Sequence, residues 1–375
     1  MIIKEKRKGL AVLVLAWLCI HTYLLMRMGI VISGDGHKYY DQALVFMESG
    51  GFSENRFWLY SFYIFCRAIF IKLGIGQWGM YAFQLLLNGL AIVGFYFLVN
   101  KLTNIKSAYW ATLLLVVCYP FQYWTVHLIT ESLFFSLIIF FTGFVFITRL
   151  KITFHWLIAA LLLSMLVFTR PSGLYFLLAL IPVFFVLPLL RQHAWASILL
   201  SSGMLVLVFT IAGWSSRNTP ALDFLKPFAE NHVLCYLPVK TGPQPAKQEA
   251  GSVWHFIIQH PVQSLWLMAK RFATYWGLVR AHYSWSHNAM LILFFYPLYL
   301  FAFFGIRPLF FKNRVFTTFA LSLFMVFTLS VMLTCDDWSN RFLLPLVPFI
   351  IIFAVTGFMH VFEGRSFANF GSIVH

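Results

Sequence analysis

Apolar runs of about 20 residues recur along the chain, and they restrict its possible folds more than any other feature of the sequence. A helix of this length crosses the hydrocarbon core of a bilayer, where only helices and closed barrels satisfy their backbone hydrogen bonds. Hydrophobic residues make up 61% of the chain and charged residues only 10%, whereas a soluble domain carries about a quarter. The sequence therefore predicts an all-α polytopic membrane protein with one integral membrane domain, residues 1–375.

We expect about ten transmembrane helices, at 10–32, 77–100, 108–124, 129–148, 154–169, 174–190, 195–214, 289–306, 315–333 and 342–362. The first run follows a basic segment, 4–8. It is too long for the core of a signal peptide and lacks a small-residue cleavage site, so we expect a retained anchor with a cytoplasmic N-terminus. Every short loop on the cytoplasmic side then contains Lys or Arg, and both termini are cytoplasmic.

This topology leaves two long loops outside the cytoplasm. They are a first loop at 33–76, with juxtamembrane helices, and a second at 215–286. The outer loops contain no N-x-S/T acceptor sequence, and nothing in the chain is similar to an organellar address. We therefore expect a bacterial inner membrane rather than the endoplasmic reticulum, with the polar loops facing outside.

The first outer loop is the most polar part of the chain, since residues 33–56 contain four of its 12 carboxylates. Asp35 lies between two glycines, which allow the backbone to turn sharply there. From Tyr39 and Tyr40 onward, apolar residues at helical spacing predict a short amphipathic helix along the bilayer surface, ended by Gly50-Gly51. The apolar segment that follows contains Arg67, which favours a second surface-lying helix or a shallow re-entrant segment. A plain solvated loop is the alternative.

Several ionisable residues converge on the same side of the membrane as Asp35. They are Glu131, Arg170, Asp336, Asp337 and Arg341, each next to the outer end of an expected span. An ionisable group at this depth costs a few kcal/mol unless it is paired or faces a wet cavity. The sequence therefore predicts a shared polar cavity that opens outward.

Each of these residues also has a structural interpretation. Glu131 can favour a helix N-terminus with Thr130 as its cap, and Arg170 can extend to the lipid headgroups. Asp336 and Asp337 can be a solvated pair in an outer turn. Arg341 can be an interfacial anchor or an ion-pair partner of Asp337.

Several classes of site are not expected. The net charge is +15, yet no basic patch with interleaved aromatic residues indicates a nucleic-acid partner. Outer histidines lack the spacing of a metal site, and no cofactor is expected. Asp336-Asp337 leaves room for a divalent cation, which we do not predict. The five cysteines have no CxxC spacing, although Cys235 and Cys335 both lie outside, where one disulfide is possible.

The segment GDGHKYYDQALVFMESGGFS, residues 34–53, resembles the first outer loop of the GT-C superfamily of membrane glycosyltransferases. These polytopic enzymes use polyprenyl- or dolichyl-phosphate sugars, and the closest resemblance is to PMT/ArnT-like members. Three further segments are similar in order, namely ITESLF at 129–134, RPSG at 170–173 and NRFLLPLVPF at 340–349. The chain departs from the oligosaccharyltransferase branch, since it lacks a WWDYG-type motif and a large C-terminal soluble domain. It also lacks the prolyl outer turn after Arg56.

The resemblance implies a role for each candidate residue. Asp35 is the expected general base, which deprotonates an acceptor hydroxyl of a glycan, lipid or protein. Arg170 and Arg341 are the expected partners of the donor phosphate. The set is completed by Lys270 and Arg271 for the phosphate or headgroup, and by Tyr39, Tyr40, Glu131, Asp336 and Asp337 for the sugar or acceptor.

Two other classes of protein compete with the transferase. A transporter or flippase of a lipid-linked sugar shares the membrane fold and a cationic cavity but needs no base. Against it, the chain shows no inverted repeat, and its carboxylates collect on one face rather than at the midplane. A structural or assembly subunit is the third possibility, with the polar loops as ordinary solvated surface.

Overall fold

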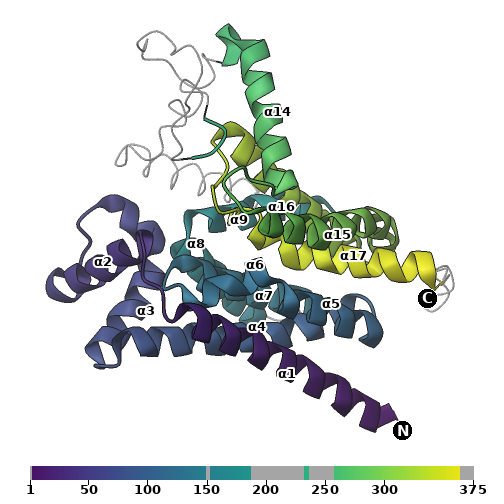
Figure 1. Cartoon of the computed structure of the whole chain (residues 1–375), viewed down its shortest axis with the longest axis horizontal. Coiled ribbons are helices and arrows are strands. Elements are labelled where there is room, and N and C mark those ends of the chain that lie inside the picture. The colour runs from purple at the N-terminus through teal and green to yellow at the C-terminus, as the bar shows by residue number, and fades with distance from the viewer. Residues whose placement is uncertain (1, 149–152, 187–231, 236–256, 364–375) are drawn as a thin grey trace. The chain divides into compact units, whose positions relative to one another are not determined.

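The computed structural model describes residues 2–148, 153–186, 232–235 and 257–363, shown in colour in Figure 1. These residues form helices and contain no β-strand, only two isolated bridges. The all-α prediction is therefore confirmed. In the first part of the chain the helices are α1 (Ile2–Met28), α2 (Asp35–Ser49), η1 (Asn55–Tyr60), α3 (Ser61–Lys72), α4 (Gly76–Leu102), α5 (Ile105–Val117), α6 (Tyr119–Gln122), η2 (Tyr123–Val126), α7 (Thr130–Thr148), α8 (Thr153–Thr169), η3 (Pro171–Gly173) and α9 (Leu174–Val186). In the second part they are α14 (Pro261–Gly277), α15 (Trp285–Lys312), α16 (Arg314–Leu333), η5 (Leu344–Leu346) and α17 (Val347–Phe362).

Six stretches of the described chain are long and apolar enough to cross a membrane, so the chain is an integral membrane protein. They are Gly9–Met28, Gly76–Leu102, Thr130–Thr148, Trp285–Lys312, Arg314–Leu333 and Leu344–Phe362. Ile105–Val117, Thr153–Thr169 and Pro171–Val183 are shorter apolar helices at three other expected spans. The expected span at 195–214 lies outside the described residues, so the number of about ten stays a prediction.

One expected span is broken. The sequence predicts a single helix over 108–124, whereas α5 ends at Val117 and the short α6 and η2 follow it. Pro120 lies in the first turn of α6, where its missing N–H costs nothing. A continuous helix would place the same ring against the preceding turn. The break is therefore a local consequence of one proline.

The segment expected to form the first outer loop contains the helices that the sequence predicts. The expected amphipathic helix is α2, and Gly50 ends it with a left-handed φ of 71° while its N–H bonds to the carbonyl of Phe46. This is the usual C-terminal role of glycine. The segment after Arg56 is also helical, since η1 leads directly into α3.

The chain divides into two compact units. The first comprises residues 1–176, 300–317 and 347–375, and the second comprises 177–299 and 318–346. In the first unit α7 is a core helix that packs against α4 and α8, and α17 packs against α5. The second contains α14 and the turn between α16 and η5. The expectation of one membrane domain stays a prediction.

Two glycines allow α15 and α17 to approach closely within the first unit. A Cβ atom on Gly305 would overlap the carbonyl oxygen of Phe353, and one on Gly357 would overlap that of Phe301. Small residues at helix interfaces are the usual means of close packing in membranes. At Gly94, by contrast, a Cβ atom would meet nothing nearer than 3.9 Å.

We expect Gly305→Ala and Gly357→Ala each to lower the thermal unfolding temperature in detergent by several degrees, because the two backbones must separate. The matched control is Gly94→Ala, which should be neutral or slightly stabilising since alanine favours a helix. Equal unfolding temperatures for all three variants would contradict the close packing.

Candidate functional site

Two helices begin beside each other at the centre of the first unit. The end of α1 is joined to the segment before α7, since Val31 N donates to Val126 O and Leu128 N donates to Val31 O, both at 2.9 Å. The start of α2 also lies against this segment, because a Cβ atom on Gly36 would stand only 3.0 Å from Leu128 O. The backbone therefore brings Asp35, the first residue of α2, towards the start of α7.

Asp35 is the more accessible carboxylate of this site. Its side chain is 36% exposed, and Lys38 Nζ lies 3.1 Å from its Oδ1. Lys38 is itself 57% exposed, and an exposed pair of this kind contributes at most about 1 kcal/mol. A ligand can therefore replace Lys38 at little cost.

Glu131 and Arg170 form a second ion pair at this site, and this pair is buried. Arg170 Nη1 donates to Glu131 Oε1, and the two side chains are 11% and 2% exposed. Glu131, in the first turn of α7, is thus paired with an arginine. Arg170 precedes η3 and is held at the protein rather than extended to the lipid headgroups.

Tyr39 shows that these charges share one neighbourhood. Burial, Tyr60 and the carboxylates of Asp35 and Glu131 hold the pKa of its hydroxyl well above the usual value, whereas Arg170 lowers that pKa. Its ring lies 5.3 Å from Tyr60 and 5.4 Å from Tyr63. The structure thus places four of the predicted residues, Asp35, Tyr39, Glu131 and Arg170, around one site.

The sequence analysis did not select Arg67, which is part of the same cluster. It is only 2% exposed, and its Nη1 donates to Leu128 O at 3.3 Å. The guanidinium stacks on the ring of the predicted residue Tyr40, 5.3 Å from its centroid. Burial raises the pKa of Tyr63, while the adjacent Arg67 lowers it and Glu131 raises it. A cation in an otherwise apolar segment was the available signal, and it was used only to assign the helix.

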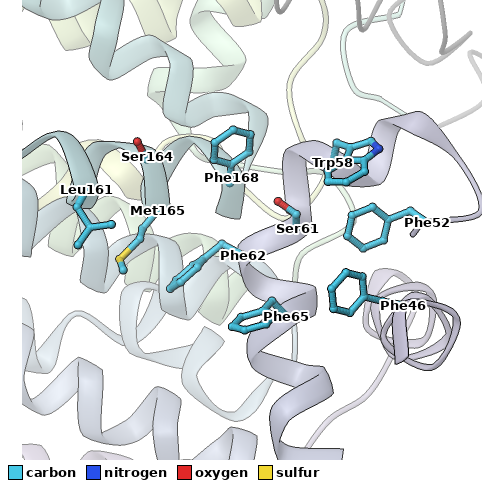
Figure 2. A pocket seen from close by; sticks show the side chains of 10 residues that line it. All are labelled: Phe46, Phe52, Trp58, Ser61, Phe62, Phe65, Leu161, Ser164, Met165 and Phe168. Atoms are coloured by element: carbon cyan, nitrogen blue, oxygen red, sulfur yellow. The ribbon is translucent and has the colours of Figure 1, made fainter. Parts of the chain in front are cut away.

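An apolar pocket of about 360 Å³ lies between α3 and α8 in the same unit (Figure 2). One wall comes from η1, α3 and the loop before η1, with Trp58, Phe65 and Phe52, and the other comes from α8, with Leu161 and Phe168. The polar groups in its lining are the serines Ser61 and Ser164, drawn in Figure 2. Such a lining suits a hydrocarbon chain rather than a sugar.

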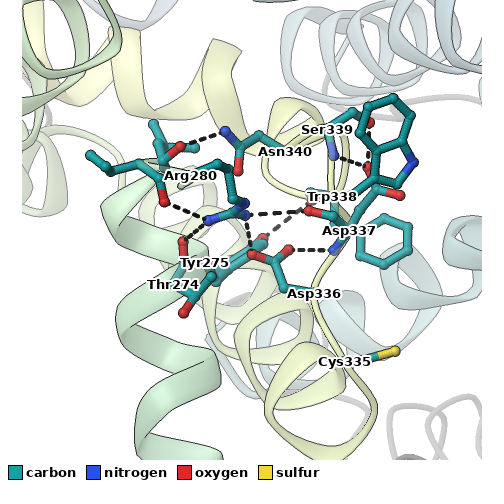
Figure 3. A network of polar contacts seen from close by, with 12 residues as sticks. Thr274, Tyr275, Arg280, Cys335, Asp336, Asp337, Trp338, Ser339 and Asn340 are labelled. Atoms are coloured by element: carbon teal, nitrogen blue, oxygen red, sulfur yellow. Dashed lines mark hydrogen bonds and ion pairs between the residues drawn. The ribbon is translucent and has the colours of Figure 1, made fainter. Parts of the chain in front are cut away.

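The second unit holds a separate buried network around Asp336 (Figure 3). Arg280 Nη2 donates to Asp336 Oδ2, and these side chains are 1% and 0% exposed. Burial raises the pKa of Asp336 to about 6, although the charge of Arg280 lowers it. Arg280 also donates to the carbonyls of Thr274 and Asp337. The sequence analysis missed Arg280, because this residue lies between α14 and α15 whereas its partner Asp336 lies between α16 and η5.

Asp337 and Arg341 are also paired. Arg341 Nε lies 2.8 Å from Asp337 Oδ1, and Ser339 N donates to Asp337 Oδ2 at 2.8 Å. The Asp337 side chain is 1% exposed. The turn therefore contains buried carboxylates with their own partners rather than the solvated pair that the sequence left open.

The two predicted cations of α14 differ in their surroundings. Arg271 is fully buried, and it donates to His232 O at 2.8 Å and to Met332 O at 2.9 Å. Lys270 is exposed and lies 5.2 Å from the centroid of the Trp266 ring. α14 therefore presents Lys270 at its surface and uses Arg271 to join two backbone segments.

A disulfide lies next to Asp336 in the second unit. Cys235 bonds to Cys335 across 100 residues, so the bridge that the sequence allows is present. Backbone hydrogen bonds lie beside it, from Asp336 N to Val233 O and from Cys235 N to Asp336 O. Within the described ranges, no group of three or more His, Cys, Asp or Glu side chains could hold a metal ion.

Comparison with known proteins supports the fold. No protein-family model matches the sequence, and no curated protein matches it. The crystal structure of the Archaeoglobus fulgidus oligosaccharyltransferase, tethered with an acceptor peptide containing the NVT sequon via a disulfide bond, aligns with a TM-score of 0.51 at 14% identity. The match covers 96% of this chain and 50% of that one, so the chain spans about half the length of that structure. This likeness shows the GT-C fold.

We expect Arg280→Ala to lower the free energy of unfolding by about 3–5 kcal/mol at pH 8, because Asp336 is left buried without its partner. Burial already raises the pKa of Asp336 to about 6, and removing Arg280 raises it further. At pH 5 the carboxyl is protonated, so the loss should be smaller.

Thermal unfolding at the two pH values checks this expectation. The double variant Arg280→Ala/Asp336→Asn is the control, and it should recover part of the stability at pH 8. A loss that does not change with pH and persists in the double variant would contradict the role of the ion pair.

Proposed function

We propose that this protein is a membrane glycosyltransferase that moves a sugar from a polyprenyl-phosphate-linked donor to a lipid, glycan or protein acceptor. One observation carries the proposal. A half-exposed carboxylate, Asp35, begins a surface helix beside the buried Glu131–Arg170 pair, on a GT-C fold. The sequence segments that resemble GT-C enzymes include all three of these residues.

The chemistry assigns one role to Asp35. Its carboxylate accepts the proton of the acceptor hydroxyl as that oxygen bonds to the anomeric carbon of the sugar. The bond from the anomeric carbon to the phosphate oxygen breaks, and its electron pair leaves with the lipid phosphate. The contact with Lys38 is exposed and contributes at most about 1 kcal/mol, so an acceptor hydroxyl can compete with it for Asp35.

Arg170 is our first candidate for the leaving phosphate. Negative charge grows on the bridging oxygen in the transition state, and a nearby guanidinium stabilises it. Glu131 orients this guanidinium through Nη1. Tyr39 and Tyr40 on α2 complete the proposed sugar and acceptor side.

The remaining assignments rest on the sequence. Lys270, Arg271, Arg341, Asp336 and Asp337 all lie in the second unit, and their roles toward phosphate, sugar or acceptor stay predictions. No metal or other cofactor is part of the proposal. We assign the apolar pocket of Figure 2 to the polyprenyl chain of the donor.

The disulfide supports the proposed orientation. Disulfides form and persist in oxidising compartments such as the bacterial periplasm, and Cys235–Cys335 closes loops that the topology places outside. We therefore propose a bacterial inner-membrane protein with cytoplasmic termini and a site on the extracytoplasmic face.

Asp35→Asn should abolish sugar transfer, because it keeps the size and hydrogen bonding of the side chain but removes the base. The purified protein is incubated in detergent with a panel of polyprenyl-phosphate sugars and candidate acceptors, and released polyprenyl phosphate is measured. The matched control is Asp41→Asn, an exposed carboxylate on the same helix, which should retain turnover. Donor binding should be unchanged in both variants.

Normal turnover of Asp35→Asn would remove this residue from the mechanism. If the wild type releases no polyprenyl phosphate from any donor that it binds, a transporter of lipid-linked sugars explains the site better.

Arg170→Ala should weaken donor binding, because it removes a guanidinium from the phosphate site. It also leaves Glu131 buried without this partner, which lowers stability. The double variant Arg170→Ala/Glu131→Gln separates the two effects, since it should regain stability but not donor affinity. Recovery of both properties would reduce Arg170 to a structural residue.

A further inference from the structure

The charge at Arg67 is not balanced by a direct carboxylate contact. Within the described part of the chain, Arg67 forms no ion pair, and its Nη2 has no hydrogen-bond partner. Arg67 donates to a backbone carbonyl, Leu128 O, and is hydrogen-bonded with the hydroxyl of Tyr63, so neither partner supplies a negative charge. Removing a guanidinium from water without a counter-charge costs several kcal/mol. The burial of Arg67 therefore costs stability that no direct ion pair offsets.

The neighbours of Arg67 connect it to the site of the proposed reaction. Tyr63 contacts Arg67, and its ring lies 5.4 Å from that of Tyr39. Tyr39 in turn lies within the electrostatic range of Asp35, Glu131 and Arg170. Arg67 thus reaches the reaction site through two tyrosines, from the opposite side of α3 to the pocket residues.

The other cations at this site already have carboxylate partners. Arg170 is paired with Glu131, and Lys38 is paired with Asp35. Arg67 is a further positive charge at this site, and an anion that enters would give it a direct counter-charge. A guanidinium suits a phosphate monoester or diester, since its planar fork of N–H donors matches two phosphate oxygens.

We propose that Arg67 binds the phosphate of the lipid donor, as a positioning residue held in place before the ligand arrives. This inference rests on the proposed function and adds a residue to its donor site. The half-buried ring of Tyr40 stacks on the guanidinium at 5.3 Å and occupies the place of the ligand. A rotation of the Tyr40 side chain exposes Nη2 to the phosphate.

Binding of lipid probes tests the proposal without turnover. Affinities of the purified full chain for a polyprenyl monophosphate and for the uncharged polyprenol of the same length are compared in detergent. We expect Arg67→Gln to lower the affinity for the monophosphate at least about tenfold and to leave the affinity for the polyprenol unchanged. Arg56→Gln, which removes an exposed arginine of the same loop, is the matched control and should change neither affinity.

Stability provides a second readout that a structural arginine would not give. Because the buried charge is uncompensated, Arg67→Gln should unfold at the same temperature as the wild type or higher when no ligand is present. Tyr40→Ala leaves Arg67 in place and removes the ring, so it should bind the monophosphate more tightly than the wild type and the polyprenol equally. If Arg67→Gln does not fold, the Tyr40→Ala comparison decides, and an unchanged monophosphate affinity there would overturn the proposal.

Two further arms identify the source of the phosphate and separate the two proposals. Inorganic phosphate and phosphatidic acid are added as competitors, and displacement by either at concentrations near that of the monophosphate would show a general anion site instead of a donor site.

If Arg67→Gln retains its preference for the monophosphate while the wild type transfers sugar, the role of Arg67 is wrong and the transferase stands. If the preference is lost but no donor is cleaved, the phosphate site stands and the transferase fails.

Discussion

The site depends on how the backbone is satisfied where the helices are interrupted between α5 and α7. Pro120 ends α5, and carbonyls in this interval lose their helical partners, which is costly where water is excluded. Side chains replace those partners: Gln84 of α4 donates to the carbonyls of Thr125 and His127, and Gln122 of α6 donates to that of Leu115. Together with the Val31 bridge, these bonds position Asp35 relative to Glu131.

The arginines separate into those that hold the fold and one that the fold leaves uncompensated. Arg170, Arg280 and Arg341 contact carboxylates, and Arg271 bonds to two backbone carbonyls. A guanidinium removed from water needs such partners, so most of these contacts are what burial itself requires. Within the described part of the chain, Arg67 has neither a carboxylate contact nor a second backbone carbonyl, and its Nη2 is left without a hydrogen-bond partner. In a membrane protein few positions let a guanidinium reach water, so its partners within the protein decide how costly its burial is.

Some of these features could be predicted from residues close together in the chain. The helix from Asp35 to Ser49 and its end at Gly50 follow from helical spacing and from the ability of glycine to adopt a positive φ. The break at Pro120 is also local, yet the sequence was interpreted there as one span because hydrophobicity alone does not register a missing N–H. Arg67 and Arg280 could not be assigned, since their meaning depends on partners in other helices.

By itself the sequence determined that this is a helical membrane protein with a polar segment after its first apolar run. The length of an apolar run and the spacing of its apolar residues are local properties of the sequence. A run of about 20 residues indicates a span because it matches the thickness of the bilayer. Only the tertiary structure decided which charges meet. Glu131 and Arg170 are 39 residues apart and Arg280 and Asp336 are 56 apart, so each pair exists only once particular helix faces have packed. A charge has the same appearance in the sequence whether it is paired or left for a ligand, because its energy depends on neighbours that folding brings to it.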